Sequence, residues 1–134
     1  MLSKKAQYAL RAVSYLGARY NTSPIQISEI AENKNIPLKF LEIILLELNK
    51  AGILGSKKGK GGGYYMIEKP EKTSLAKIIR TIDGPIAMLP CVSLYFYEKC
   101  TDCNEKVCNL NKTFIEARDA ILKVLEKRTV KDIL

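Results

Sequence analysis

A glycine- and lysine-rich segment at 55–63 constrains the fold of this 134-residue chain more than any other feature. It separates two short apolar stretches, Ile53-Leu54 and Tyr64-Tyr65-Met66-Ile67, whose residue types suit β-strands. The run Gly59-Lys60-Gly61-Gly62-Gly63 favours a turn, because glycine adopts backbone conformations that other residues avoid. We therefore predict a two-stranded hairpin with a basic tip. The run does not match a nucleotide-binding phosphate loop, which continues with Lys-Ser or Lys-Thr and a helix.

Helical periodicity precedes this hairpin. Apolar residues recur every three or four positions over 3–20, and Ser3 is a suitable N-cap for a helix there. A break at 21–24 follows. We then expect a short strand at 25–27 and a short helix that Ser28 caps.

A helix-turn-helix is predicted next, because a tight turn at 33–35 joins the short helix to a longer one. The longer helix begins at Pro37 and ends near Ala51-Gly52. Lys39 and Glu42 lie opposite its apolar face. Lys39 suits a phosphate or a guanine edge, and Glu42 suits a cytosine amino group, although both residue types also suit a solvated helix surface. With the hairpin as a wing, residues 1–84 form a winged helix-turn-helix domain.

The charge distribution supports a nucleic-acid partner. Residues 1–82 carry 14 lysines and arginines against 6 acidic residues, whereas residues 83–134 carry 8 of each, so the whole net charge of +8 lies in the first part. A basic surface of this kind suits double-stranded DNA, although a generally lysine-rich composition is the alternative. The candidate DNA-binding residues are Ser3, Lys4, Lys5, Ser28, Lys39, Glu42, Lys57, Lys58 and Lys60.

Two further helices are expected after the wing. One fits 74–82 and ends at Asp83-Gly84-Pro85. The other fits 111–128 within a C-terminal segment, 111–134, and has apolar residues on two sides. We expect it to pack against a second subunit, with an ordinary core helix as the alternative. Thr129 and Asp132 form a capping box. The predicted fold class is mainly α with a small β wing and a long dimerisation helix.

Four cysteines lie in the remaining segment, 85–110, and the chain contains no histidine. They are Cys91, Cys100, Cys103 and Cys108. In the reducing cytoplasm, clustered cysteines are more often metal ligands or redox sensors than structural disulfides. Four thiolates complete an iron–sulfur site or a zinc site. Because only two of these cysteines form a close pair, the spacing favours an iron–sulfur cluster (2Fe–2S or 4Fe–4S) over zinc.

A metal-free thiol switch through Cys100-Thr101-Asp102-Cys103 remains a third possibility. The neighbouring lysines are expected to favour thiolate over thiol. They are Lys99, Lys106 and Lys112.

Several segments resemble the Rrf-type bacterial winged-helix regulators, a family that includes IscR, NsrR and CymR. The resemblance covers nearly the whole chain. It is carried by Ser3-Lys4-Lys5-Ala6-Gln7-Tyr8-Ala9-Leu10, Ile27-Ser28-Glu29-Ile30-Ala31, Ile36-Pro37-Leu38-Lys39-Phe40-Leu41-Glu42 and Gly59-Lys60-Gly61-Gly62-Gly63-Tyr64. It implies a homodimer that binds a partly palindromic operator, with the long C-terminal helices crossing at the interface.

The resemblance also implies ligands. In cluster-binding members three cysteines precede the dimer helix; Cys91 and Cys108 match the first and last, and either Cys100 or Cys103 matches the middle one. One branch places a histidine where this chain has Asn111, and another takes an acidic ligand from the first helix of the partner, where this chain has Gln7. The additional cysteine then supplies the fourth ligand. This chain also departs from the family at position 43: many relatives have a polar residue there, on the DNA-facing side, where this chain has Ile43.

These observations favour a DNA-binding transcriptional regulator that senses redox state, iron–sulfur status or nitric oxide. A zinc-stapled DNA-binding protein and a small redox electron carrier are the alternatives. Against an enzyme, the sequence has no histidine, no flavin or nicotinamide fingerprint and no paired carboxylates. No apolar run approaches the roughly 18 residues of a membrane span, so we expect a cytoplasmic protein.

Overall fold

The computed structural model describes residues 1–134 as a mainly helical protein with one two-stranded sheet. Its first helix, α1, spans Lys4–Ala18. Ser3 caps this helix as predicted, because its hydroxyl accepts the N–H of Ala6 at 3.0 Å. The alanines at positions 6, 9 and 12 are fully buried along one face. Their small side chains allow the neighbouring elements to approach α1 closely.

The predicted helix-turn-helix follows α1. Helix α2 (Ile27–Lys34) is joined to helix α3 (Leu38–Lys50) by a short turn. Asn35 adopts a left-handed conformation in this turn, with φ of 52°. Asparagine tolerates that conformation better than most residues. Ile36 is buried in the core and anchors the turn.

The start of α2 differs from the prediction. The strand expected at 25–27 is a single bridge, in which Ile25 pairs with Tyr64 of the wing. The chain passes directly from this bridge into α2, with Gln26 at the N-cap and no capping bond from its side chain. The prediction that Ser28 caps α2 is therefore wrong; Ser28 is an exposed residue in the first turn.

The wing consists of antiparallel strands β1 (Leu54–Lys57) and β2 (Gly63–Met66). Leu54 and Met66 pair at its base and are both buried. Gly63 has a φ of +150°, and a Cβ there would lie 2.2 Å from the carbonyl oxygen of Ile25. Glycine therefore allows β2 to contact the segment before α2, and this contact fixes the wing to the helix-turn-helix.

The hydrophobic core lies between α1, α2, α3, the base of the wing and helix α4 (Leu75–Asp83). Ser74 caps α4 by accepting the N–H of Lys77 at 3.2 Å. A short 3-10 turn, η1 (Pro70–Lys72), connects the wing to α4. Fully buried side chains come from all parts of this domain, and include Leu16, Ile30, Leu41, Leu45, Leu48, Leu54 and Ile78.

The cysteine segment separates α4 from the last long helix. Between them lies a single 3-10 turn, η2 (Pro90–Val92). Helix α5 spans Asn109–Lys127 and so begins two residues before the predicted start. Cys108 explains this earlier start, because its sulfur acts as the N-cap and accepts the N–H of Asn111 at 3.4 Å.

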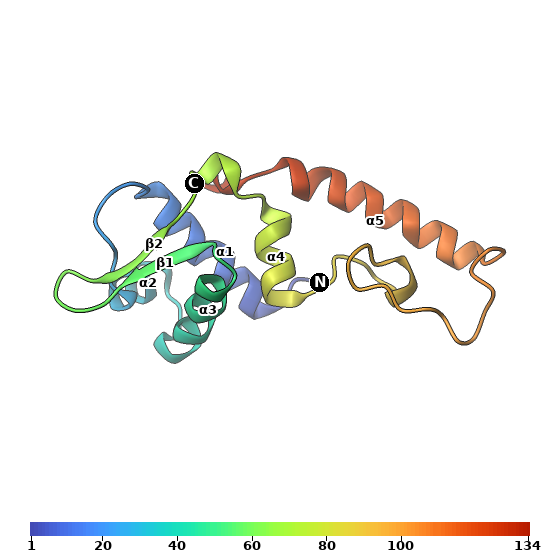
Figure 1. The fold of residues 1–134 in the computed structure, drawn as a ribbon, viewed down its shortest axis with the longest axis horizontal. Coiled ribbons are helices and arrows are strands. Elements are labelled where there is room, and N and C mark those ends of the chain that lie inside the picture. Colours follow the sequence, from blue (N-terminus) through green and yellow to red (C-terminus); the bar gives the residue numbers. More distant parts are fainter.

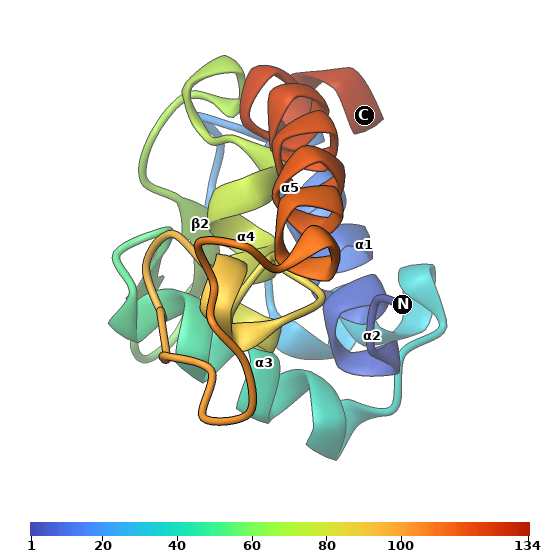
Figure 2. The same cartoon turned by 90° about the vertical axis from the view of Figure 1, so that its right-hand side faces the viewer.

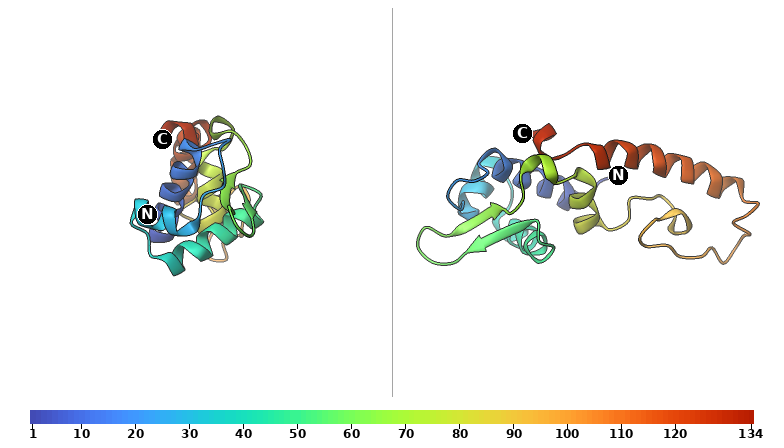
Figure 3. Two further views of the ribbon diagram at one scale, coloured as in Figure 1. Left: turned by 90° about the vertical axis from the view of Figure 1, so that its left-hand side faces the viewer. Right: turned by 45° about the horizontal axis from the view of Figure 1, so that its top comes forward.

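The molecule is elongated (Figure 1). The winged-helix domain occupies one end and the cysteine segment the other, and α5 runs back from the second towards the first. Seen from the end that carries the cysteine segment, α5 lies in front of the winged-helix domain (Figure 2), and its C-terminal end contacts α4. A final 3-10 turn, η3 (Val130–Ile133), opens with the predicted capping box of Thr129 and Asp132. The view in Figure 3 shows η3 returning to the winged-helix domain.

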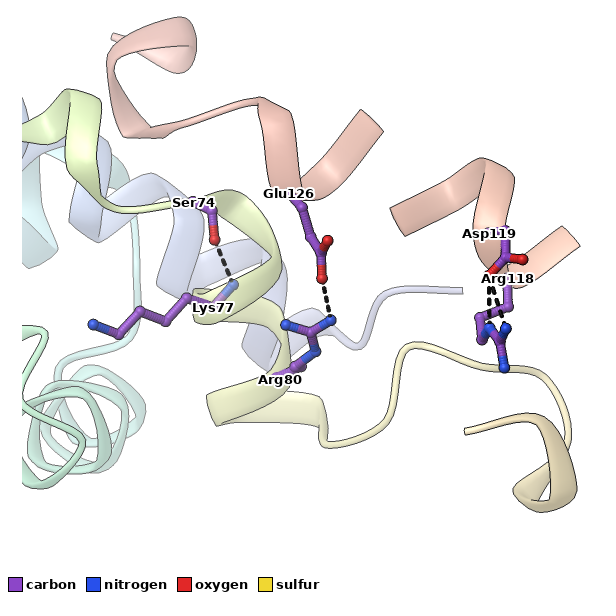
Figure 4. A network of polar contacts seen from close by, with 6 residues as sticks. All are labelled: Ser74, Lys77, Arg80, Arg118, Asp119 and Glu126. Carbon is purple, nitrogen blue, oxygen red and sulfur yellow. Dashed lines mark hydrogen bonds and ion pairs between the residues drawn. The ribbon is translucent and has the colours of Figure 1, made fainter. Parts of the chain in front are cut away.

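Polar contacts fix the C-terminal end of α5 to the winged-helix domain. Arg80 of α4 donates to Glu126 of α5 at 2.7 Å (Figure 4). The main-chain N–H of Leu75 donates to the carbonyl of Arg128 at 2.9 Å. The N-terminal end of α5 instead projects towards the cysteine segment. No helix combines the length and the apolar character needed to cross a membrane.

Candidate functional site

All four cysteines line a single cavity of about 260 Å³. Cys91 lies in η2, Cys100 and Cys103 lie in the loop that follows, and Cys108 caps α5. The loop folds back between η2 and α5, which brings the first and last cysteines to one site. Cys103 is exposed, whereas the other three are partly buried.

Cys100 and Cys103 form the closest pair of thiols. The Cys103 thiol donates to the Cys100 sulfur with an Sγ–Sγ distance of 3.1 Å. This hydrogen bond, with desolvation and a contact to Cys108, raises the pKa of Cys103 to about 12. The prediction that nearby lysines favour thiolate is therefore wrong for Cys103. Its position as a proton donor holds the thiol form.

Cys108 has the opposite tendency. The backbone N–H of Asn111 at the start of α5 lowers the pKa of the Cys108 thiol, and the hydrogen bond from Cys103 contributes in the same direction. Negative charge at a helix N-terminus is favoured by the free N–H groups there. The pKa of Cys108 is thus lowered, whereas that of Cys103 is raised.

Asn111 connects two of the cysteines. Its side chain is only 7% exposed, and its Nδ2 donates to the Cys91 sulfur at 3.4 Å. Its backbone N–H donates to the Cys108 sulfur at the same distance. This one residue therefore holds η2 against the start of α5. Gln7, the other position where a ligand was considered, is exposed in α1 and donates to the carbonyl of Leu2.

Glu105 organises the loop between the cysteines. Its carboxylate accepts the N–H of Cys100 at 2.9 Å and the hydroxyl of Tyr97 at 2.7 Å. These bonds lower the pKa of Glu105. Neither Glu105 nor Tyr97 belongs to a sequence motif, and their only signal is their position within the cysteine segment.

Arg118 fixes η2 to the middle of α5. Its Nη1 donates to the carbonyl of Val92 at 2.6 Å, and its guanidinium also contacts Asp119 (Figure 4). The side chain is only 14% exposed, so it is part of the packing between the two elements. This role has no signal in the sequence, because Arg118 resembles the other charged residues of an amphipathic helix.

The cysteine cavity fits a metal centre in donor type. Four soft thiols in one cavity are the ligands that iron–sulfur clusters and zinc take. No three histidine, cysteine or acidic side chains already converge as ligands around a point. The fit therefore rests on the identity of the donors and on the cavity that the four cysteines share.

The predicted DNA-binding residues at the N-terminus differ in their surroundings. Ser3 is the cap of α1, and both its N–H and its hydroxyl donate to Asp83. Lys5 forms an ion pair with Glu47 of α3. Lys4 is exposed, with its ammonium 5.2 Å from the ring centre of Tyr8. Lys4 is thus the best placed of the three to reach a phosphate.

The other predicted DNA-binding residues are all exposed, and none takes part in an ion pair within the chain. Lys39 and Glu42 lie in the first turns of α3, and the wing lysines lie around the tip of the hairpin. These residues are Ser28, Lys39, Glu42, Lys57, Lys58 and Lys60.

The chain is similar in sequence to known transcriptional regulators. The family model described as Rrf2, iron-dependent transcriptional regulator, matches residues 2–134. An rrf2-like HTH-type transcriptional regulator of Rhodobacter capsulatus is 39% identical over 138 residues, which cover 100% of this chain and 92% of that protein. NsrR of Halalkalibacterium halodurans, an HTH-type transcriptional regulator, is 28% identical over 133 residues. The match covers 99% of this chain and 89% of that protein.

A solved structure has the same fold over almost the whole chain. CymR, the global cysteine regulator of B. subtilis, matches with a TM-score of 0.81 and 27% sequence identity. The match covers 99% of this chain and 95% of that one. The predicted fold, mainly helical with a small wing, is confirmed.

Proposed function

The chain belongs to the Rrf2 family of transcriptional regulators, and on this premise we propose that it senses redox state, iron–sulfur status or nitric oxide through a cysteine-ligated iron–sulfur cluster. Its relatives are transcriptional regulators rather than enzymes. The output is binding to a double-stranded DNA operator. A protein with this task works in the cytoplasm, where thiols stay reduced.

The observation that carries the proposal is the shared cavity of the four thiols. A cluster bound there supplies a redox- and nitric-oxide-sensitive group whose properties depend on its ligands and on hydrogen bonds to sulfur. We assign Cys91, Cys100, Cys103 and Cys108 as the ligands. Asn111 then supports the site by orienting the first and the last of them.

The connection from site to DNA runs through α5. Cys108 caps this helix at one end, and Arg80 and the main chain of Leu75 hold its other end on the winged-helix domain. Ligation by all four cysteines would order 91–108 and would thereby set the direction of α5. In a dimer, α5 governs the distance between the two recognition helices, which must match half-sites about 34 Å apart.

A homodimer is part of the proposal. Apolar residues remain exposed on α5 at helical spacing, with Leu110, Ile121 and Val124 at 58%, 42% and 55% exposure. Exposing a long apolar stripe to water is unfavourable. The same stripe of a second copy can bury it in a symmetric dimer. A dimer also suits a partly palindromic operator.

Metal analysis of protein purified without oxygen tests the sensing proposal. We expect a brown protein with iron and sulfide in matching amounts, and reduced cluster content when any one of the four cysteines is replaced by serine. Asp102→Asn is the matched control, because it alters the same loop without removing a sulfur. A Cys→Ser variant with undiminished iron excludes that residue as a ligand.

A metal-free thiol switch is the second candidate, and the 3.1 Å distance between the Cys100 and Cys103 sulfurs favours it. It predicts a colourless protein without iron, even after reconstitution, in which oxidation joins these two cysteines. A colourless protein with one zinc per subunit would instead indicate a structural zinc site.

A further inference from the structure

The exposed face of α3 is unexpectedly apolar. Leu38, Ile43 and Leu46 are 45%, 51% and 49% exposed, although they lie in a helix whose other face is fully buried in the core. A helix that only covers a core carries charged or polar residues outside. These three side chains therefore form an apolar surface that the fold of the domain itself does not use.

The arrangement along the helix is specific. Lys39, Ile43, Leu46 and Lys50 lie at i, i+4, i+7 and i+11, which places them in one row along α3. All four are exposed. The row thus consists of two aliphatic side chains with a lysine at each end. We call it the α3 row.

The surroundings of the α3 row are mainly basic, with Glu42 as an exposed carboxylate beside Ile43. Asn49 of α3 donates to Ser56 of β1 at 3.1 Å, so the row lies beside the strand that carries Lys57. Glu47, which would add negative charge, is already neutralised by its ion pair with Lys5. The occupant should therefore combine negative charge with an apolar group. Duplex DNA fits best, because α3 is the second helix of a helix-turn-helix and the DNA backbone supplies the negative charge.

The chemistry of the row identifies what it contacts. In the major groove the C5-methyl of thymine is the prominent apolar group, and aliphatic side chains contact it. The flanking lysines can reach phosphates on either side of the groove, which fix the register of the helix. Both parts of the row therefore match a duplex that presents thymine in the groove.

We propose that Ile43 and Leu46 contact thymine methyl groups of the operator and so select A·T pairs at those positions. The inference rests on the proposed DNA binding and specifies what the recognition helix reads. Glu42, one turn from Leu46, then accepts from a cytosine amino group at a neighbouring pair.

Deoxyuridine tests the proposal, because it differs from thymidine only by the missing methyl. A duplex is first selected from a random library by the full-length wild-type protein. Each thymine of a half-site is then replaced in turn by uracil, and affinity is measured at constant salt. We expect one or two positions at which uracil weakens binding about threefold to fourfold, the equivalent of one buried methyl group.

Variants connect the effect to the row. Ile43→Gln should abolish the preference for thymine over uracil at one position, whereas Ile43→Val should keep most of it. Lys39→Gln is the matched control: it should weaken binding to thymine and uracil duplexes by the same factor. Because Ile43 is half exposed, the folding of these variants should match the wild type in a thermal melt.

The outcomes separate this inference from the proposed function. A selected duplex whose affinity is indifferent to uracil overturns the thymine contact and leaves DNA binding intact. Failure to select any duplex overturns both. A change in the sedimentation of Ile43→Gln without DNA would show that the row is a contact between copies, and would also overturn the proposal.

Discussion

Single residues determine how the cysteine segment is held. Asn111 is the clearest case, because one buried side chain and its own backbone N–H contact two cysteines that are far apart in sequence. A histidine at this position would offer a nitrogen atom as a metal ligand, whereas the amide of Asn111 offers a hydrogen-bond donor to sulfur. The residue thus supports sulfur ligands, which is consistent with a site completed by a fourth cysteine.

Replacing Asn111 by alanine should expose Cys91. The substitution removes the side-chain donor but keeps the backbone N–H that Cys108 accepts. In reduced, metal-free protein we therefore expect faster alkylation of Cys91 and an unchanged rate at Cys108. Timed labelling followed by mass spectrometry measures both in one sample. Equal acceleration at the two cysteines would contradict a specific role for the side chain.

Gly63 should not tolerate alanine. The added Cβ would meet the carbonyl oxygen of Ile25 at 2.2 Å, at a φ of +150°. We expect a loss of about 2–4 kcal/mol in the free energy of unfolding. Gly59→Ala is the control, because Gly59 also has a positive φ but no atom within 4 Å of its Cβ position. It should cost only about 1–2 kcal/mol for the backbone conformation.

Urea denaturation of the two glycine variants makes this comparison. If Gly59→Ala is as destabilising as Gly63→Ala, the close contact between β2 and the segment before α2 is not what requires glycine.

At the scale of elements, the wing and α3 carry the DNA-facing charges. The wing lysines surround a tip that makes no contact with the core, so their role is independent of folding. Because Ser3 and Lys5 are engaged within the chain, the phosphate contacts depend more on the wing and on Lys39 than the sequence suggested.

Replacing the three wing lysines by glutamine should weaken DNA binding for all sequences alike. The slope of log K against log salt should also become shallower, by about 0.9 for each phosphate contact that is lost. Titration of one duplex at several salt concentrations measures this slope. Lys72→Gln in η1, on the side of the domain that packs against η3, is the control and should leave the slope unchanged. An unaltered slope in the triple variant would remove the wing from the interface.

The elements themselves were largely predictable. Helices and wing follow from apolar spacing and glycine, because local backbone preferences determine them. The misplaced cap of α2 shows the limit: the bridge between Ile25 and Tyr64 joins distant residues and decides where the helix begins. The start of α5 was missed because cysteine is an unusual N-cap. Contacts such as that of Arg118 with Val92 depend on the folded loop and leave no local pattern.

At the scale of the whole molecule, α5 runs from the cysteine segment back to the winged-helix domain. A second contact joins the same two parts, because Arg80 of α4 lies 4.6 Å from the ring centre of Tyr95. One face of α5 packs against α4 and η2, and its apolar stripe remains exposed. The proposed dimer interface and the cap formed by Cys108 therefore lie on the same helix, which couples the arrangement of the two subunits to the state of the cysteines.

Val124→Glu should disrupt the dimer while the subunit stays folded. Val124 is 55% exposed in the single chain, so a glutamate is solvated there, but in the dimer it would be buried without a partner. We expect at least a tenfold weaker association in sedimentation, together with weaker operator binding. Lys123→Glu, on a different side of α5, is the control. If Val124→Glu remains dimeric at all concentrations, the exposed stripe is not the interface.

The most direct test of the account is the affinity of one operator duplex for the cluster-loaded and the cluster-free forms of the same preparation. We expect two different affinities, with a ratio in the range of about 5- to 150-fold that is typical of coupled sites. The difference should disappear in a Cys→Ser variant that cannot hold the cluster. Equal affinities of the loaded and cluster-free forms would contradict the claim that the cysteine segment controls DNA binding.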